Sequence, residues 1–185
     1  MDATTGPTAS GLLPDEAWRE RLVALGIAFL RVGFGLVFLT NGISKATGWD
    51  GIEPFPGFLI DYDGAKNILT FDVQTHPIGI YKDFIDDVVI EQYGVFGPLL
   101  TVTEIAIGLM LISGAFANVG ALIGALFALH LNFANWDRNI WAWEYAVEWI
   151  PLIALFLIGS GRYFGLDGAA VKFLPPPLRR WPLTG

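Results

Sequence analysis

The chain has 185 residues, of which 54% are hydrophobic and 16% are charged, and its net charge is −7. A chain of this length forms one domain, and so small a soluble domain has too little interior to bury this much apolar surface. The negative charge argues against nucleic-acid partners. The absence of cysteine excludes disulfides, iron–sulfur clusters and thiolate metal sites made by this chain alone.

The first apolar segment runs from Leu22 to Ser44 and is interrupted only by Arg31. A membrane-spanning helix needs about 20 mostly apolar residues, and this segment is too long for the hydrophobic region of a cleavable signal peptide. We therefore expect residues 1–21 to form a cytoplasmic segment. Residues 22–44 are expected to form the first of four spans in a single membrane domain, residues 22–161.

A long connection, residues 45–96, separates the first span from the second and contains an amphipathic stretch after Pro77. One side of the predicted helix is apolar and the other is charged. The apolar side carries Ile80, Tyr81, Phe84, Ile85, Val88 and Val89, and the charged side carries Lys82, Asp83, Asp86, Asp87 and Glu91. This pattern is typical of a helix that lies on a membrane or caps a bundle. It fits a surface helix of an extramembrane loop equally well.

Three further apolar segments follow, at about residues 97–116, 119–133 and 140–160. Lipid offers no partner to a free amide or carbonyl, so these segments must be helical. The sequence therefore predicts an all-α membrane protein, a bundle of four transmembrane helices with a long outer loop. A C-terminal tail over residues 162–185 follows the bundle.

Basic residues are distributed unevenly between the connections. Four spans place both termini and the turn between the second and third spans on one side of the membrane. That side carries Arg19, Arg21, Arg162, Lys172, Arg179 and Arg180, whereas the long connection is strongly acidic. By the positive-inside rule, we expect a multi-pass protein of the cell membrane with both termini in the cytoplasm.

Ionisable residues inside the apolar segments are costly, so each needs a reason. Arg31 lies about 14 Å from the cytoplasmic end of its span, and Glu104 enters from the other side to a depth of about 11 Å. In a hydrocarbon core about 30 Å thick these levels nearly coincide. The sequence therefore predicts an Arg31–Glu104 ion pair. His130 is expected at a similar depth, with Asn41 and Glu148 nearer the outer surface.

Small residues share a helix face with these polar groups, which lets neighbouring backbones approach closely. The predicted stripes are Arg31, Gly35, Phe38, Gly42 and Lys45 in the first span; Gly97, Thr101, Glu104, Gly108 and Ala115 in the second; Gly120, Gly124 and Ala128 in the third; and Glu144, Glu148, Leu155, Gly159 and Arg162 in the fourth. We expect these faces to converge inside the bundle.

The predicted polar cluster has two interpretations. It can be a structural ion pair that fixes which helix faces which. It can also relay protons or bind the polar head of a lipid-soluble ligand such as a quinone, whose carbonyls suit an Arg, His or Glu between aromatic and aliphatic walls. On the second interpretation, Glu104 and His130 are the candidate catalytic residues. The candidate cofactor-binding residues are Arg31, Asn41, Lys45, Glu104, His130 and Glu148. We expect no haem and no other metal, since His76 and His130 are the only histidines.

Three motifs in chain order resemble the DoxX/DoxD-like family of integral membrane proteins. They are Arg31 followed by a glycine-bearing apolar run and Gly42-x-x-Lys45, then Glu104 with Gly108 and Gly114, and finally Gly159-Ser-Gly161-Arg162 followed by Leu166-Asp167. The resemblance implies a small four-helix subunit, usually prokaryotic, of a quinone-linked redox system. DoxD-like proteins of this kind are the membrane component of thiosulfate:quinone oxidoreductase.

The same resemblance implies quinone as the cofactor and an oligomer or hetero-complex with a DoxA-like or other redox subunit. The long connection has no catalytic signature of its own. An alternative is therefore a non-catalytic membrane scaffold for a redox or stress-response enzyme. A small transporter is less well supported, because the spans contain no obvious inverted repeat.

Overall fold

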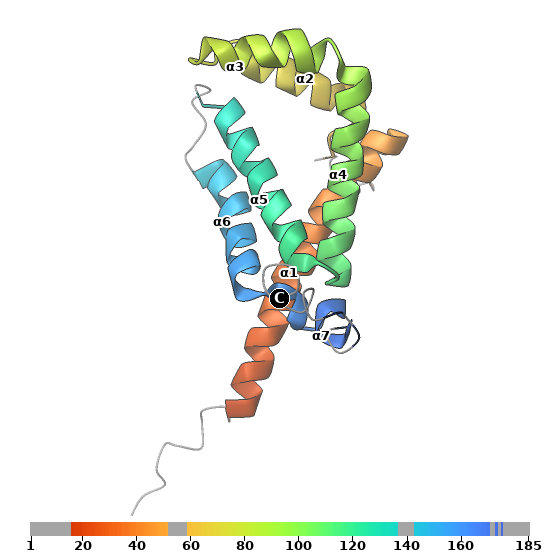
Figure 1. Ribbon diagram of the computed structural model, residues 1–185, viewed down its shortest axis with the longest axis vertical. Helices are drawn as coiled ribbons and strands as arrows, with labels where there is room; N and C mark the ends of the chain where they lie inside the picture. The colour runs from red at the N-terminus through yellow and green to blue at the C-terminus, as the bar shows by residue number, and fades with distance from the viewer. Residues whose placement is uncertain (1–15, 52–58, 137–142, 171–172, 174, 176–185) are drawn as a thin grey trace, which may run out of the picture.

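The computed structural model describes residues 16–51, 59–136 and 143–170, together with 173 and 175. Within these residues the regular elements are all helices and there is no strand (Figure 1). The longest are α1 (Glu16–Thr47), α4 (Tyr93–Ser113), α5 (Ala117–Ala134) and α6 (Trp143–Ile158). The predicted all-α class is confirmed.

Three of these helices, α1, α4 and α5, are long and apolar enough to cross a membrane. Helix α6 has 16 residues, which corresponds to about 24 Å and falls short of a hydrocarbon core of about 30 Å. The structure therefore supports a membrane protein with three candidate spans, and the fourth complete span is not confirmed. Residues 140–142 of the predicted fourth span lie outside the described residues.

Helices α2 (Tyr62–Val73) and α3 (Gly79–Phe84), with the π-helical segment η2 (Ile85–Ile90), lie across one end of the bundle, here named the cap end (Figure 1). The helix predicted after Pro77 is thus present and caps the bundle. Only part of its predicted apolar side is covered. Ile85 is buried, whereas Ile80 and Phe84 are 82% and 51% exposed.

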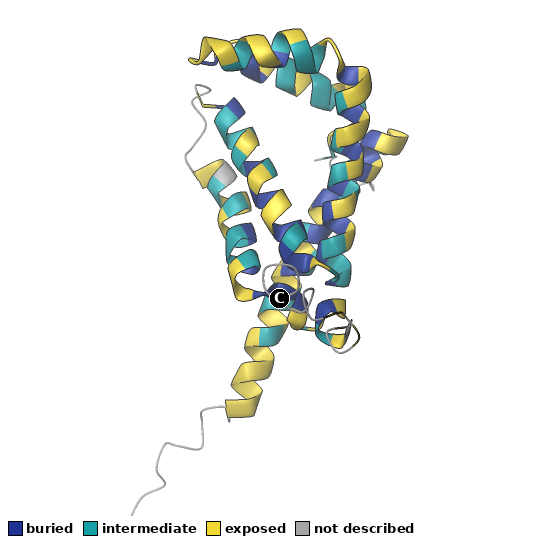
Figure 2. Ribbon diagram, viewed as in Figure 1, coloured by how far each residue is buried: buried dark blue, intermediate teal, exposed yellow. Residues whose placement is uncertain are grey.

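The opposite end, here named the turn end, holds the α4–α5 turn, the 3₁₀ turn η3 (Ser160–Arg162) and the short helix α7 (Leu166–Ala170). Helix α4 stops at Ser113 because Gly114 takes the left-handed conformation, with φ of 70°. Helix α1 begins six residues before the predicted start and projects beyond this end (Figures 1 and 2). Its side chains there, including those of Val23 and Phe29, are exposed.

Helices α1 and α4 are antiparallel and approach closely through glycine. A Cβ added at Gly35 would lie 2.7 Å from a side-chain carbon of Ile112, and one added at Gly108 would lie 2.6 Å from the backbone nitrogen of Leu39. Each residue forward along α1 is therefore matched by one residue back along α4. This register decides which polar residues of the two helices can meet.

The predicted stripes are largely confirmed by burial. All five stripe residues of α1 are buried, as are Gly97, Thr101, Glu104 and Gly108 of α4 and the three small residues of α5. The stripe predicted for the fourth span is wrong in part, since Leu155 is buried but Glu144, Glu148 and Arg162 are exposed. Gly159, with φ of 75°, ends α6 and turns the chain away before Arg162.

Candidate functional site

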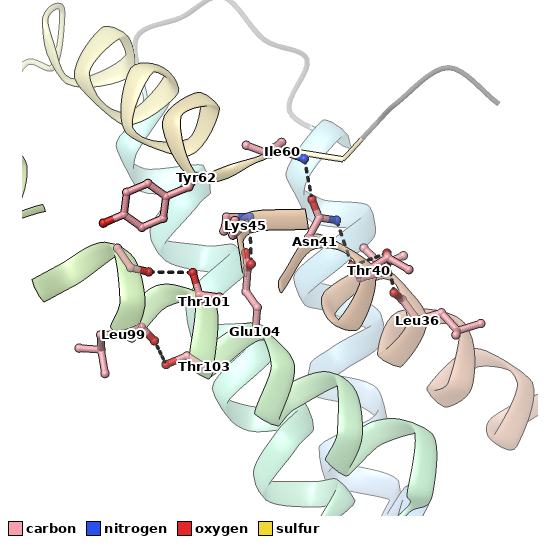
Figure 3. Close-up of polar contacts among 12 residues, drawn as sticks. Leu36, Thr40, Asn41, Lys45, Ile60, Tyr62, Leu99, Thr101, Thr103 and Glu104 are labelled. Carbon is pink, nitrogen blue, oxygen red and sulfur yellow. Dashed lines mark hydrogen bonds and ion pairs between the residues drawn. The ribbon is translucent and has the colours of Figure 1, made fainter. Parts of the chain in front are cut away.

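Glu104 pairs with Lys45. The Lys45 Nζ lies 2.9 Å from Glu104 Oε2, and the two side chains are only 4% and 6% exposed (Figure 3). Removing such charges from water is costly, and their mutual attraction offsets that cost only while both partners are present. The pair lies near the cap end, where Lys45 occupies the last turn of α1.

The predicted Arg31–Glu104 pair is wrong, and the register of the two helices explains why. By that register Glu104 is level with Ile43 of α1, whereas Arg31 is level with Phe116 beyond the end of α4. Twelve residues of helix separate the two levels, or about 18 Å at 1.5 Å per residue. The predicted pair requires all spans to lie between the same two planes, whereas α1 projects past its neighbours at the turn end.

Arg31 is instead the centre of the turn end. Its Nη1 donates to the carbonyl of Ser160 at 2.7 Å and its Nη2 donates to that of Phe164 at 3.3 Å. The side chain is 1% exposed, and a Cβ on Gly114 would come within 2.7 Å of Nη1. These contacts link α1 to residues 160–164, which follow α6.

Asp167 completes this end of the bundle. Its two carboxylate oxygens accept from the backbone N–H groups of Phe116 at 2.8 Å and Ala117 at 3.1 Å, and its own N–H donates to Gly114. The first N–H groups of a helix have no partner within the helix. Asp167 supplies a hydrogen-bond acceptor to the first N–H of α5, although it lies 50 residues away in the sequence. Local capping patterns do not predict this role.

Two adjoining cavities, each of about 130 Å³, meet at the Lys45–Glu104 pair. Both are lined by Lys45, Glu104, Ile60, Phe127 and Leu131. The first extends between α1, α5 and α6, and its further lining is Phe34, Val37, Phe38, Asn41 and Glu148. The second extends beneath α2, and its further lining is Ala65, Ile68, Leu69, Asp72, Tyr93, Leu100 and His130.

Five of the six predicted cofactor-binding residues therefore meet around these cavities, and Arg31 does not join them. Asn41 is also part of the frame, since its Oδ1 accepts from the Ile60 N–H at 3.2 Å and its Nδ2 donates to the Val37 carbonyl (Figure 3). Glu148 is exposed at the edge of the first cavity. The polar residues thus surround a largely apolar space with the ion pair at its centre.

Aromatic residues join the cap to the cavity. The Tyr81 hydroxyl of α3 lies 3.0 Å from His130 Nε2, and the Tyr81 ring packs edge-on against Phe133 at 4.9 Å between centroids. The Tyr62 hydroxyl of α2 donates to the Tyr93 carbonyl at 2.9 Å. The amphipathic pattern predicts Tyr81 on the apolar face of its helix but does not predict this polar contact. Its position on the face toward the bundle was the only available signal.

In the part of the chain that the structure describes, no group of three His, Asp or Glu residues is arranged to hold a metal ion. Comparison with protein-family models, with curated proteins and with solved structures finds no match. The geometry of the cavities and the residues around them therefore indicate which functions this protein can have.

Proposed function

We propose that this protein is a membrane subunit of a quinone-linked redox system, and that the quinone head group binds at the Lys45–Glu104 pair. The observation that carries the proposal is the meeting of two apolar cavities at one buried ion pair. The resemblance to DoxX/DoxD-like proteins supports it, with thiosulfate:quinone oxidoreductase as the corresponding system. A DoxA-like or other redox subunit would then supply electrons.

The size and chemistry of the cavities fit a single ring. An apolar protein cavity of about 150 Å³ binds benzene, and each cavity here measures about 130 Å³. The Lys45 ammonium can donate to a quinone carbonyl, and Glu104 can exchange the proton that reduction requires. Phe34, Phe38 and Phe127 supply apolar contacts.

The direct test is the binding of ubiquinone-1 to purified protein in lipid nanodiscs, measured by equilibrium dialysis. We expect saturable binding by the wild type and at least tenfold weaker binding by Glu104→Gln and Lys45→Met. Glu91→Gln, which changes an exposed carboxylate outside both cavities, serves as the matched control. Equal affinity of all four proteins, with helicity unchanged, would refute the site.

One observation favours the second candidate, a scaffold for a redox or stress-response enzyme. The projecting part of α1 exposes Leu22, Val23, Leu25 and Phe29, a face that a partner's transmembrane helix could cover. A wild-type protein that binds no ubiquinone-1 but copurifies with a stable enzyme would favour this function. Loss of that enzyme in a Val23→Ser/Phe29→Ser variant would assign the surface.

The orientation inferred from charge, with both termini in the cytoplasm, is part of the proposal and places the cap end outside. The chain has no cysteine, so single introduced cysteines can be labelled without background. In intact cells, a membrane-impermeant maleimide should label Asp83→Cys on α3 and spare Ala169→Cys on α7. The reverse pattern would invert the assignment.

A further inference from the structure

Tyr81 packs against His76, and both ring nitrogens of His76 have backbone hydrogen-bond partners. His76 Nδ1 accepts from the Ile78 N–H at 3.2 Å, and His76 Nε2 lies 3.0 Å from the carbonyl of Phe133. A carbonyl only accepts and Nδ1 already accepts from Ile78, so His76 carries its proton on Nε2. The Tyr81 ring packs against this fixed ring at 4.6 Å between centroids. Its hydroxyl is thereby aimed at His130.

The hydroxyl of Tyr81 keeps its proton, since burial raises the pKa of this phenol. Its partner in the described structure is His130 Nε2, at 3.0 Å. If the phenol donates, Nε2 must be unprotonated. The proton of a neutral His130 then lies on Nδ1, which is the opposite tautomer to that of His76.

We propose that Tyr81 is a positioning residue that holds neutral His130 as its Nδ1–H tautomer, so that Nδ1–H is the donor His130 offers to the second cavity. His130 lines that cavity together with Lys45 and Glu104. The ligand part of this inference rests on the proposed function, whereas the tautomer part does not. The cap, through α3, thereby determines which ring nitrogen of His130 carries the proton that can be donated to a ligand oxygen.

The tautomer is measured by long-range ¹H–¹⁵N NMR on protein with ¹⁵N-labelled histidine in nanodiscs, at a pH where both rings are neutral. With two histidines in the chain, a His130→Gln variant assigns the signals. We expect wild-type His130 to show a protonated Nδ1 and Tyr81→Phe to shift the proton to Nε2. His76 should show a protonated Nε2 in both proteins and serves as the internal control.

Tyr62→Phe is the matched variant, because it also removes one phenol hydroxyl that bonds across the cap end. It should leave the His130 signals unchanged. A wild-type His130 protonated on Nε2, or a tautomer that Tyr81→Phe does not alter, would overturn the proposal. Tyr81→Phe keeps the ring that packs against Phe133, so folding is expected to be preserved.

The ligand part is tested by ubiquinone-1 affinity. Loss of the positioned donor should weaken binding on the order of tenfold in Tyr81→Phe, the equivalent of one hydrogen bond, and leave Tyr62→Phe close to wild type. A shifted tautomer with unchanged affinity would overturn the positioning role but leave binding at Lys45–Glu104 intact. A wild type that binds no quinone would refute the proposed function, while the NMR result would still decide the tautomer.

Discussion

Arg31 and Lys45 are two buried cations on the same face of α1, and their surroundings differ. Arg31 donates to two backbone carbonyls and is packed so closely that a Cβ on Gly165 would come within 2.5 Å of its Nη1. Lys45 faces one carboxylate and lines two cavities. A cation bonded to fixed backbone groups stabilises the fold. A cation beside open volume remains available to a ligand.

The largest effect that this comparison predicts is on Arg31. Arg31→Met leaves the carbonyls of Ser160 and Phe164 without their charged donor, so we expect a loss of about 3 kcal/mol or more in unfolding free energy. Denaturation in mixed micelles measures it. Arg21→Met, an exposed arginine of the same helix, should change stability little. If the loss is below 1 kcal/mol, Arg31 is not a structural centre.

The register that separates the two cations is tested by Gly108→Ala. Its new methyl group would meet the Leu39 backbone, which cannot move without displacing α1, and we expect a cost of about 1–3 kcal/mol. Gly33→Ala is the control, because a Cβ there has no atom within 4 Å. Thermal unfolding followed by circular dichroism compares them. Equal midpoints would contradict the close approach of α1 and α4.

A smaller loss of unfolding free energy is expected at Asp167, whose carboxylate accepts from the N–H groups at the start of α5. Asp167→Asn keeps one oxygen acceptor and loses the other, so the N–H of Phe116 or Ala117 loses its partner. A lost helix cap costs about 1 kcal/mol. Faster amide exchange at these two residues would locate the change, with Asp83→Asn as an exposed control. Unchanged exchange would show that Asp167 is not the cap.

Much of the bundle was predictable because helix periodicity places glycine and charge on one face. The stripe from Arg31 to Lys45 is buried as predicted. The helix ends were less accessible, since they depend on backbone conformations such as those of Gly114 and Gly159. The length of each helix relative to its neighbours also lies outside the sequence pattern. Because α1 extends past its neighbours at the turn end, Arg31 lies far from Glu104 and the predicted pair between them is wrong.

In the candidate site, too, the sequence predicts which residues take part but not which of them are in contact. Lys45, Glu104 and His130 were identified from residue type and position along their helices. Which of them touch depends on the offset between α1 and α4, and that offset is set by contacts such as Leu39 against Gly108. Tyr81 was missed because an amphipathic pattern reports which side of a helix is apolar and not which hydroxyl finds a partner.

The smallest stability effect is expected where the functional effect is large, at the Lys45–Glu104 pair. A Lys45→Met/Glu104→Leu double variant removes both charges together, and replacing a buried ion pair with apolar residues of similar size is often neutral or stabilising. We expect its unfolding free energy to lie within about 1 kcal/mol of wild type, while Lys45→Met alone is less stable because Glu104 is left unpaired. Ubiquinone-1 binding should be at least tenfold weaker than wild type in both.

The double variant also separates the two interpretations of the pair. If the pair only fixed the order of the helices, removing it would loosen the bundle at the cap end. The Tyr62–Tyr93 contact there would then weaken, and amide exchange in the first turn of α4 would accelerate. If the pair exists for a ligand, exchange in that turn should match wild type in the absence of quinone. Adding quinone should slow it in the wild type alone, because only that protein keeps the charges that hold the head group.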